Sequence, residues 1–155
     1  MSTTTRTIHG APEEVFDVLG NAWSYSQWVV GASRVRDVSP DWPGVGATMH
    51  HSVGAWPVLI DDTTSIVRWE PPEVLELTVR AWPSGEGLVR ITCRPVGDGT
   101  EVTMEEDATK GPALLIPRLL RDPVLHRRNI EALRRLANLV ERAARWPQAA
   151  PPPTS

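Results

Sequence analysis

The middle of this chain alternates apolar and polar residues, a pattern that allows each strand to bury only one face. Leu75, Leu77 and Val79 alternate with Glu76 and Arg80, which predicts a sheet with one buried and one solvated face. Turn-forming Gly and Pro residues interrupt the pattern at intervals too short for crossover connections, so we expect an antiparallel meander. The expected strands are residues 34–38, 47–53, 58–69, 74–82, 88–95 and 100–108, with a weaker first strand at 3–8.

Helical periodicity flanks this region on both sides. Residues 12–20 and 21–30 are expected to form two short helices, and residues 123–145 a long terminal helix of about 33 Å. Asp122 is the expected N-cap of the long helix, with Pro123 in its first turn. The expected fold class is α+β, with a curved antiparallel sheet of about seven strands around the terminal helix and a ligand space between them. The predicted inner stripe of the helix is Ile130, Leu133, Ala137, Val140 and Ala144.

Length and composition fit a single domain over residues 1–145. Residues 146–155, WPQAAPPPTS, cannot continue a helix and are expected to form a disordered tail. The lone Cys93 cannot form an internal disulfide. We expect a cytoplasmic protein without a membrane span, since neither a secretory signal nor a long apolar run is evident.

Charge is distributed unevenly, with eight Arg against three acidic residues between 118 and 145. One interpretation is an interaction module that docks through an Arg-rich helix. The alternative is a solvated Arg face on a helix that packs against an acidic sheet. The pI near 5.8 favours the second interpretation over a nucleic-acid partner.

Four motifs carry a resemblance to a known superfamily. They are GVGATMHHSVG at 44–54, SIVRWEPPEVLEL at 65–77, GDGTEVTMEED at 97–107 and RNIEALRRLANLVE at 128–141. With the element order, they resemble the helix-grip fold of the START-like, or SRPBCC, superfamily, in its polyketide cyclase/dehydrase and lipid-transport branch. The resemblance covers about residues 3–145. It implies a cavity for apolar or amphipathic small molecules, with catalysis in only some members.

A His/Asp pair is the strongest candidate for chemistry. In a hairpin centred on Trp56, His51 lies opposite Asp61 on the inner face, and His50 lies opposite Asp62 outside. A carboxylate beside a partly buried imidazole raises its pKa and orients the ring, as a general base that enolises a ketone requires. The alternatives are purely structural cross-strand pairs, or a one-residue slip that exchanges the two pairs.

Glu106 shares the inner face of its strand with Val102 and Met104. It is a candidate second acid or ligand hydrogen-bond group. Alternatively, its carboxylate reaches solvent or pairs with an Arg. The candidate catalytic residues are therefore His51, Asp61 and Glu106.

Trp is unusually abundant, with seven residues against one Phe and one Tyr. Indole rings offer flat apolar area and an N–H donor, which suits an aromatic ligand, although ordinary core filling is the alternative. The expected ligand-binding residues are Trp28, Met49, Trp56, Trp69, Leu77, Val79, Met104 and Leu133.

No metal site or cofactor is expected. His50 and His51 project to opposite faces of a strand, and no HExxH motif, paired Cys motif or phosphate loop occurs. The predicted partner is an apolar small molecule of polyketide, lipid or isoprenoid-like class, with no nucleic acid and a possible homodimer. The alternative function is an aromatase/cyclase-type enzyme that uses His51 as a base.

Overall fold

The structure, a computed structural model, describes residues 1–55, 58–81 and 85–145. The predictions made for Trp56, for the end of the strand at residue 82 and for the tail at 146–155 therefore lie outside the described residues.

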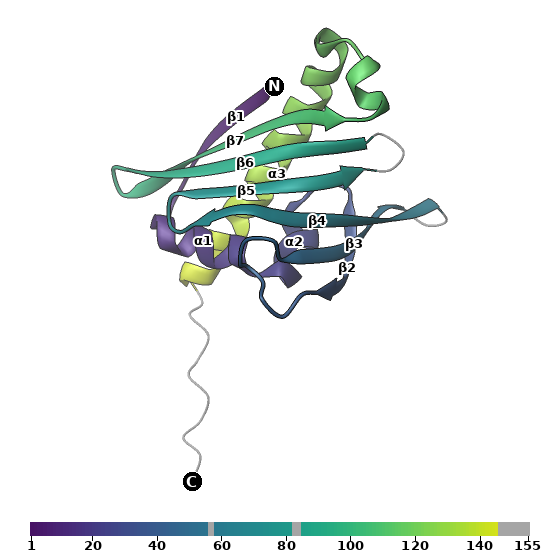
Figure 1. Cartoon of the computed structure of the whole chain (residues 1–155). Coiled ribbons are helices and arrows are strands. Elements are labelled where there is room, and N and C mark those ends of the chain that lie inside the picture. The colour runs from purple at the N-terminus through teal and green to yellow at the C-terminus, as the bar shows by residue number, and fades with distance from the viewer. Residues whose placement is uncertain (56–57, 82–84, 146–155) are drawn as a thin grey trace.

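A seven-stranded antiparallel sheet forms one layer, in the order β1-β7-β6-β5-β4-β3-β2. Consecutive strands from β2 to β7 are neighbours, as a meander requires, and β1 joins the edge beside β7 (Figure 1). This confirms the predicted antiparallel sheet and its number of strands. The strands are β1 Ser2–Ile8, β2 Ala32–Val38, β3 Thr48–Ala55, β4 Val58–Glu70, β5 Val74–Ala81, β6 Gly85–Val96 and β7 Gly99–Lys110.

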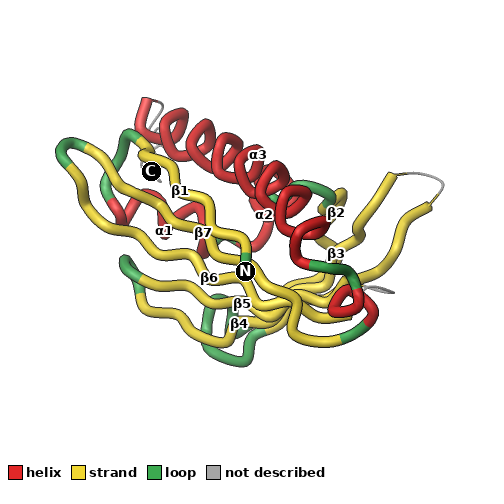
Figure 2. The backbone as a smooth tube through the Cα atoms, turned by 90° about the horizontal axis from the view of Figure 1, so that it is seen from above, coloured by secondary structure: helices red, strands yellow, loops and turns green. Residues whose placement is uncertain are grey.

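Helices cover one face of the sheet. The short helices α1 (Pro12–Gly20), η1 (Ala22–Ser24) and α2 (Tyr25–Trp28) follow β1, and η2 (Pro112–Leu115) leads into the long helix α3 (Arg118–Arg145). Figure 2 shows α3 lying along the concave side of the curved sheet. The predicted α+β helix-grip architecture is confirmed.

The inner face of α3 differs in part from the prediction. Leu133, Ala137 and Val140 are buried as expected, but Ile130 is 46% exposed and Ala144 is exposed. Asn129 takes the inward position beside Ile130, because its amide has a bonding partner on β7. The full buried set of α3 is Asn129, Ala132, Leu133, Leu136, Ala137 and Val140.

The start of α3 also differs from the prediction. The helix begins at Arg118, so Pro123 lies inside it and Asp122 is not its N-cap. The Asp122 carboxylate instead lies 3.7 Å from the Met1 ammonium and 3.8 Å from Arg121 Nε. Pro123 lacks the backbone N–H that would bond to the carbonyl of Leu119, so the first turns of α3 are less tightly bonded than the rest.

Truncation of the α3 contact surface tests which residues hold the helix on the sheet. Leu136→Ala is expected to lower the free energy of unfolding by about 2–5 kcal/mol, since it leaves a cavity in the core. Ile130→Ala is the matched control and should cost less than about 1 kcal/mol, since its side chain is half-exposed. Urea denaturation measures both values. Equal losses would contradict the assignment of the inner face.

Candidate ligand pocket

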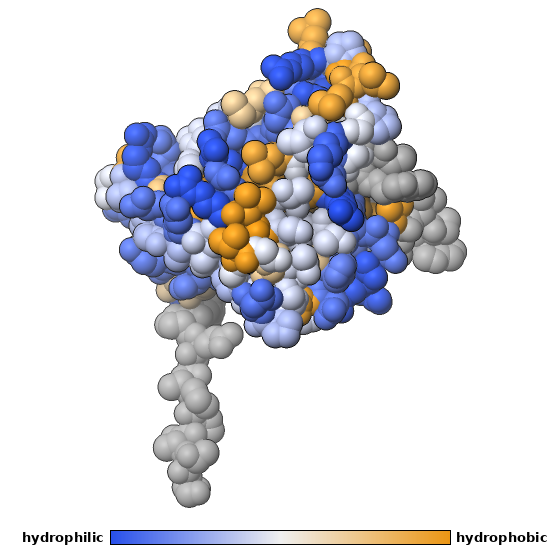
Figure 3. Space-filling model, in the orientation of Figure 1, coloured by the Kyte–Doolittle hydropathy of each residue, from blue (hydrophilic) through white to orange (hydrophobic). Residues whose placement is uncertain are grey.

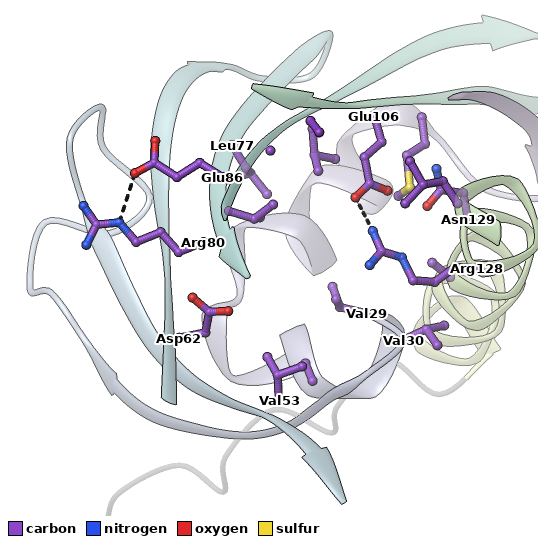
Figure 4. Close-up of a pocket in the computed structure, with 18 of the residues that line it drawn as sticks. Val29, Val30, Val53, Asp62, Leu77, Arg80, Glu86, Glu106, Arg128 and Asn129 are labelled. Carbon is purple, nitrogen blue, oxygen red and sulfur yellow. Dashed lines mark hydrogen bonds and ion pairs between the residues drawn. The ribbon is translucent and has the colours of Figure 1, made fainter. Parts of the chain in front are cut away.

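A cavity of about 320 Å³ lies between the concave face of the sheet and the N-terminal half of α3. Figure 4 shows side chains around it from the segment that follows α2, from strands of the sheet and from α3. Such a volume lies at the small end of the range for ligand pockets. Its apolar lining consists of Trp28, Val29, Val30, Ala32, Val53, Leu77, Val79, Val89, Met104, Ala108, Ile116, Leu125 and Ala132.

One polar cluster in the pocket joins β7 to α3. The buried Glu106 carboxylate accepts a hydrogen bond from Arg128 through Oε1 (Figure 4). In the amide orientation that satisfies its neighbours, Asn129 donates to Glu106 Oε2 at 2.9 Å and to the Leu125 carbonyl at 3.3 Å. Both carboxylate oxygens therefore have partners, and the charge of Glu106 is matched by Arg128.

A second polar group is a hydrogen-bonded chain of three buried side chains. His51 Nε2 lies 3.0 Å from Thr64 Oγ1, and the Tyr25 hydroxyl lies 3.2 Å from the same oxygen. The Tyr25 and His51 rings also pack with their centroids 5.1 Å apart. His51 and Tyr25 both line the pocket.

Burial sets the protonation states of His51 and Tyr25 in this hydrogen-bonded chain. It lowers the pKa of His51 to about 4, and the nearby Arg36 and His50 act in the same direction. Burial also raises the pKa of Tyr25 to about 12, although the Thr64 hydrogen bond opposes the shift. At neutral pH the imidazole and the phenol are therefore both uncharged.

The hydrogen-bonded chain Tyr25–Thr64–His51 has one more donor hydrogen than its own hydrogen bonds use. If Tyr25 donates to Thr64 and Thr64 donates to His51, the remaining N–H is on His51 Nδ1, which has no hydrogen-bond partner among the described residues. If the bonds run the other way, the remaining O–H is on Tyr25. In either case one donor of these two pocket-lining residues lacks an acceptor within the hydrogen-bonded chain.

The comparisons with known proteins agree with this geometry. The model of the polyketide cyclase/dehydrase and lipid transport family matches residues 2–144. The chain belongs to this family. None of the curated proteins compared with it matches in sequence.

In the part of the chain that the structure describes, no helix is long and apolar enough to cross a membrane.

Solved structures share the fold of this family member at low identity. Protein NE0264 from Nitrosomonas europaea is 15% identical, with a TM-score of 0.72 over 92% of this chain and 95% of that one. TTHA0849 from Thermus thermophilus is 16% identical, with a TM-score of 0.68 over 92% and 98%. The di-domain ARO/CYC StfQ from the steffimycin biosynthetic pathway is 14% identical, with a TM-score of 0.72 over 92% of this chain and 50% of that one.

The hairpin of β3 and β4 is shifted by one residue from the predicted register. Ala55 pairs with Val58, so His51 lies opposite Asp62, and Ser52 lies opposite Asp61. Asp62 is buried and lines the pocket with His51, whereas the Asp61 side chain is 69% exposed and lies 3.4 Å from Arg36. The predicted inward position of Asp61 is wrong. So is the predicted rise in the pKa of His51, because burial dominates.

The predicted ligand-binding residues fall into two groups. Trp28, Leu77, Val79 and Met104 line the pocket, as do the candidate catalytic residues His51 and Glu106. Met49, Trp69 and Leu133 instead belong to the hydrophobic core or pack against it, and the pocket lining does not include them. The Trp69 ring lies 5.2 Å from the Phe16 ring.

Among the polar residues that line the pocket, Tyr25, Arg128 and Asn129 were not predicted from the sequence, and neither was Thr64, which bonds to Tyr25 and His51. Asn129 had a detectable signal, since it interrupts the apolar face of a helix and an inward polar residue there requires a partner. Tyr25 is the only Tyr in the chain. Neither signal identifies the partner, which only the fold brings close.

The buried neutral His51 predicts a specific pH dependence of stability. Between about pH 6.5 and 4 the unfolded chain protonates this imidazole and the folded chain does not, so the free energy of unfolding falls as pH falls. The loss reaches about 3 kcal/mol. We expect His51→Gln to remove this part of the acid destabilisation, as measured by urea denaturation at several pH values. His50→Gln, on the opposite face of β3, is the control, and an unchanged pH slope in His51→Gln would contradict the assignment.

Proposed function

We propose that the protein binds an apolar or aromatic small molecule, of polyketide, lipid or isoprenoid-like class, in the pocket between the sheet and α3. The observation that carries this proposal is a cavity of about 320 Å³ whose lining is mainly apolar, with a few convergent polar groups. Ligand pockets in proteins typically combine these two properties. Family membership supports the proposal, since the family description includes lipid transport.

The polar groups narrow the chemistry of the proposed ligand. The donor left over in the Tyr25–Thr64–His51 chain suits a ligand oxygen that accepts a hydrogen bond, such as a carbonyl or a phenolic oxygen. The Trp28 indole, which lines the same pocket, supplies a flat apolar surface. A planar ring system with an oxygen substituent meets both conditions.

A substitution that fills the pocket with a larger side chain tests the proposal. A hydroxylated naphthoquinone is expected to bind to the full chain and quench Trp fluorescence, since Trp28 lines the pocket. Val53→Trp places a large side chain in the cavity and should weaken binding by at least about tenfold, or about 1.4 kcal/mol. Isothermal titration calorimetry measures the affinity.

The control for this experiment is Val67→Trp, which adds the same side chain at an exposed position of β4. It should leave the affinity unchanged, and thermal unfolding of both variants verifies that they fold. Equal affinity of Val53→Trp and the unmodified chain would place the probe elsewhere and contradict the proposal.

A second candidate function is cyclisation of a linear polyketone. The specific observation in its favour is the hydrogen-bonded chain Tyr25–Thr64–His51, which links a neutral imidazole to a phenol among buried side chains. Such groups can move a proton to or from a carbonyl substrate. Two solved structures with the same fold are described as an ARO/CYC protein and as a putative protein of the dynemicin biosynthetic locus.

Kinetics separates the two candidates. If the protein cyclises a linear polyketone thioester, Tyr25→Phe and His51→Gln should each lower the rate by roughly 10²-fold or more. Their affinity for the naphthoquinone should change far less. Asp61→Asn is the control with an unchanged rate, because Asp61 lies outside the pocket. A rate in the presence of the unmodified chain that equals the uncatalysed rate would exclude cyclisation of this substrate and leave the binding proposal intact.

A further inference from the structure

The end of the molecule formed by η2 and the first turns of α3 exposes large apolar side chains. Leu115 and Leu119 are each 85% exposed. Figure 3 shows apolar surface, in orange, gathered at the top, where Figure 1 places η2 and the start of α3. An apolar group of this kind on a single chain marks an interaction surface. We call it the apolar tip, and it consists of Leu114, Leu115, Ile116, Leu119, Leu120 and Val124.

Basic residues accompany the apolar tip. Residues 110–128 contain five basic residues and one acidic residue. Arg127 follows Leu120 and Val124 at spacings of seven and three residues, so all three lie on one side of α3. The acidic groups beside the tip, Asp107 and Asp122, are matched by Arg121, by Arg118 and by the Met1 ammonium. Lys110 and Arg128 also form ion pairs, with Glu86 and Glu106. The positive excess around the tip therefore comes from Arg127, which forms no ion pair with the described residues, and from the three positive groups that share Asp107 and Asp122.

The apolar tip is continuous with the pocket. Ile116 belongs to both, since its side chain is exposed and also lines the cavity. Arg121 and Leu125, from the next turns of α3, line the cavity as well. The exposed apolar surface therefore borders the cavity.

We propose that the apolar tip docks on the surface of an anionic phospholipid bilayer. Exposed leucines enter the boundary between headgroups and acyl chains, while neighbouring Arg and Lys side chains contact the headgroup phosphates. A second copy of the chain fits less well, because a two-fold dimer would bring two positive surfaces together. Docking does not depend on the proposed function. Exchange of an apolar ligand between the bilayer and the pocket would require the proposed ligand-binding function as well.

Vesicle binding tests the proposal. The full chain should co-sediment with phosphatidylcholine vesicles that contain about 30% phosphatidylglycerol, and binding should weaken as salt rises from about 0.1 M to about 0.5 M. The double variant Leu115→Glu/Leu119→Glu should lose binding by roughly tenfold or more, since it places charges in the apolar contact. Arg127→Gln should reduce only the part of the binding that depends on anionic lipid.

The control is Val45→Glu, which places one carboxylate at an exposed apolar position outside the tip. It should bind vesicles like the unmodified chain. The double variant should keep its thermal stability and its affinity for the naphthoquinone, so a failure of docking is distinguishable from a failure of the pocket. Equal sedimentation with and without vesicles would overturn the proposal. So would light scattering that shows a dimer which the double variant dissociates, because the tip would then be covered by a second copy.

Discussion

The packing of α3 on the sheet determines the rest of this structure, and its two halves pack differently. Leu133, Leu136 and Val140 are fully buried in the C-terminal half, where each contributes about 1.5–3 kcal/mol by leaving water. The N-terminal half instead presents Arg121, Leu125 and Arg128 to the cavity. Close packing thus fixes one half of the helix, and the cavity lies under the other half.

The contact of Glu106 with Arg128 and Asn129 holds the N-terminal half of α3, which lies over the cavity. A buried carboxylate is costly without partners, and here both of its oxygens accept hydrogen bonds from α3. Long polar side chains bridge β7 and the helix over a greater distance than packed methyl groups would. The cluster therefore holds the helix in place without closing the cavity beside it.

Sequence periodicity was sufficient to predict the fold, because strands and helices each follow their own period and these connections are short. It could not fix the register of β3 and β4. The pairing of Ala55 with Val58 shifts every partner by one residue and brings Asp62, not Asp61, to the inner face. A bulge between Ile66 and Arg68 then shifts the pairing with β5 further along β4. Alternation alone does not reveal such shifts, and it does not show that Tyr25 reaches Thr64 or that Glu106 of β7 is the partner of Asn129.

The hydrogen-bonded chain of His51, Thr64 and Tyr25 carries a cost in stability. A buried polar atom without a partner costs about 1–3 kcal/mol, and His51 Nδ1 has none among the described residues. Cys93 offers a comparison, since it is also buried but lies in the core, where burial raises the pKa of its thiol to about 12 and leaves it unreactive. An apolar side chain at position 51 would avoid the cost at the pocket wall. If the pocket binds the proposed ligand, a ligand oxygen that accepts this hydrogen bond would offset the cost.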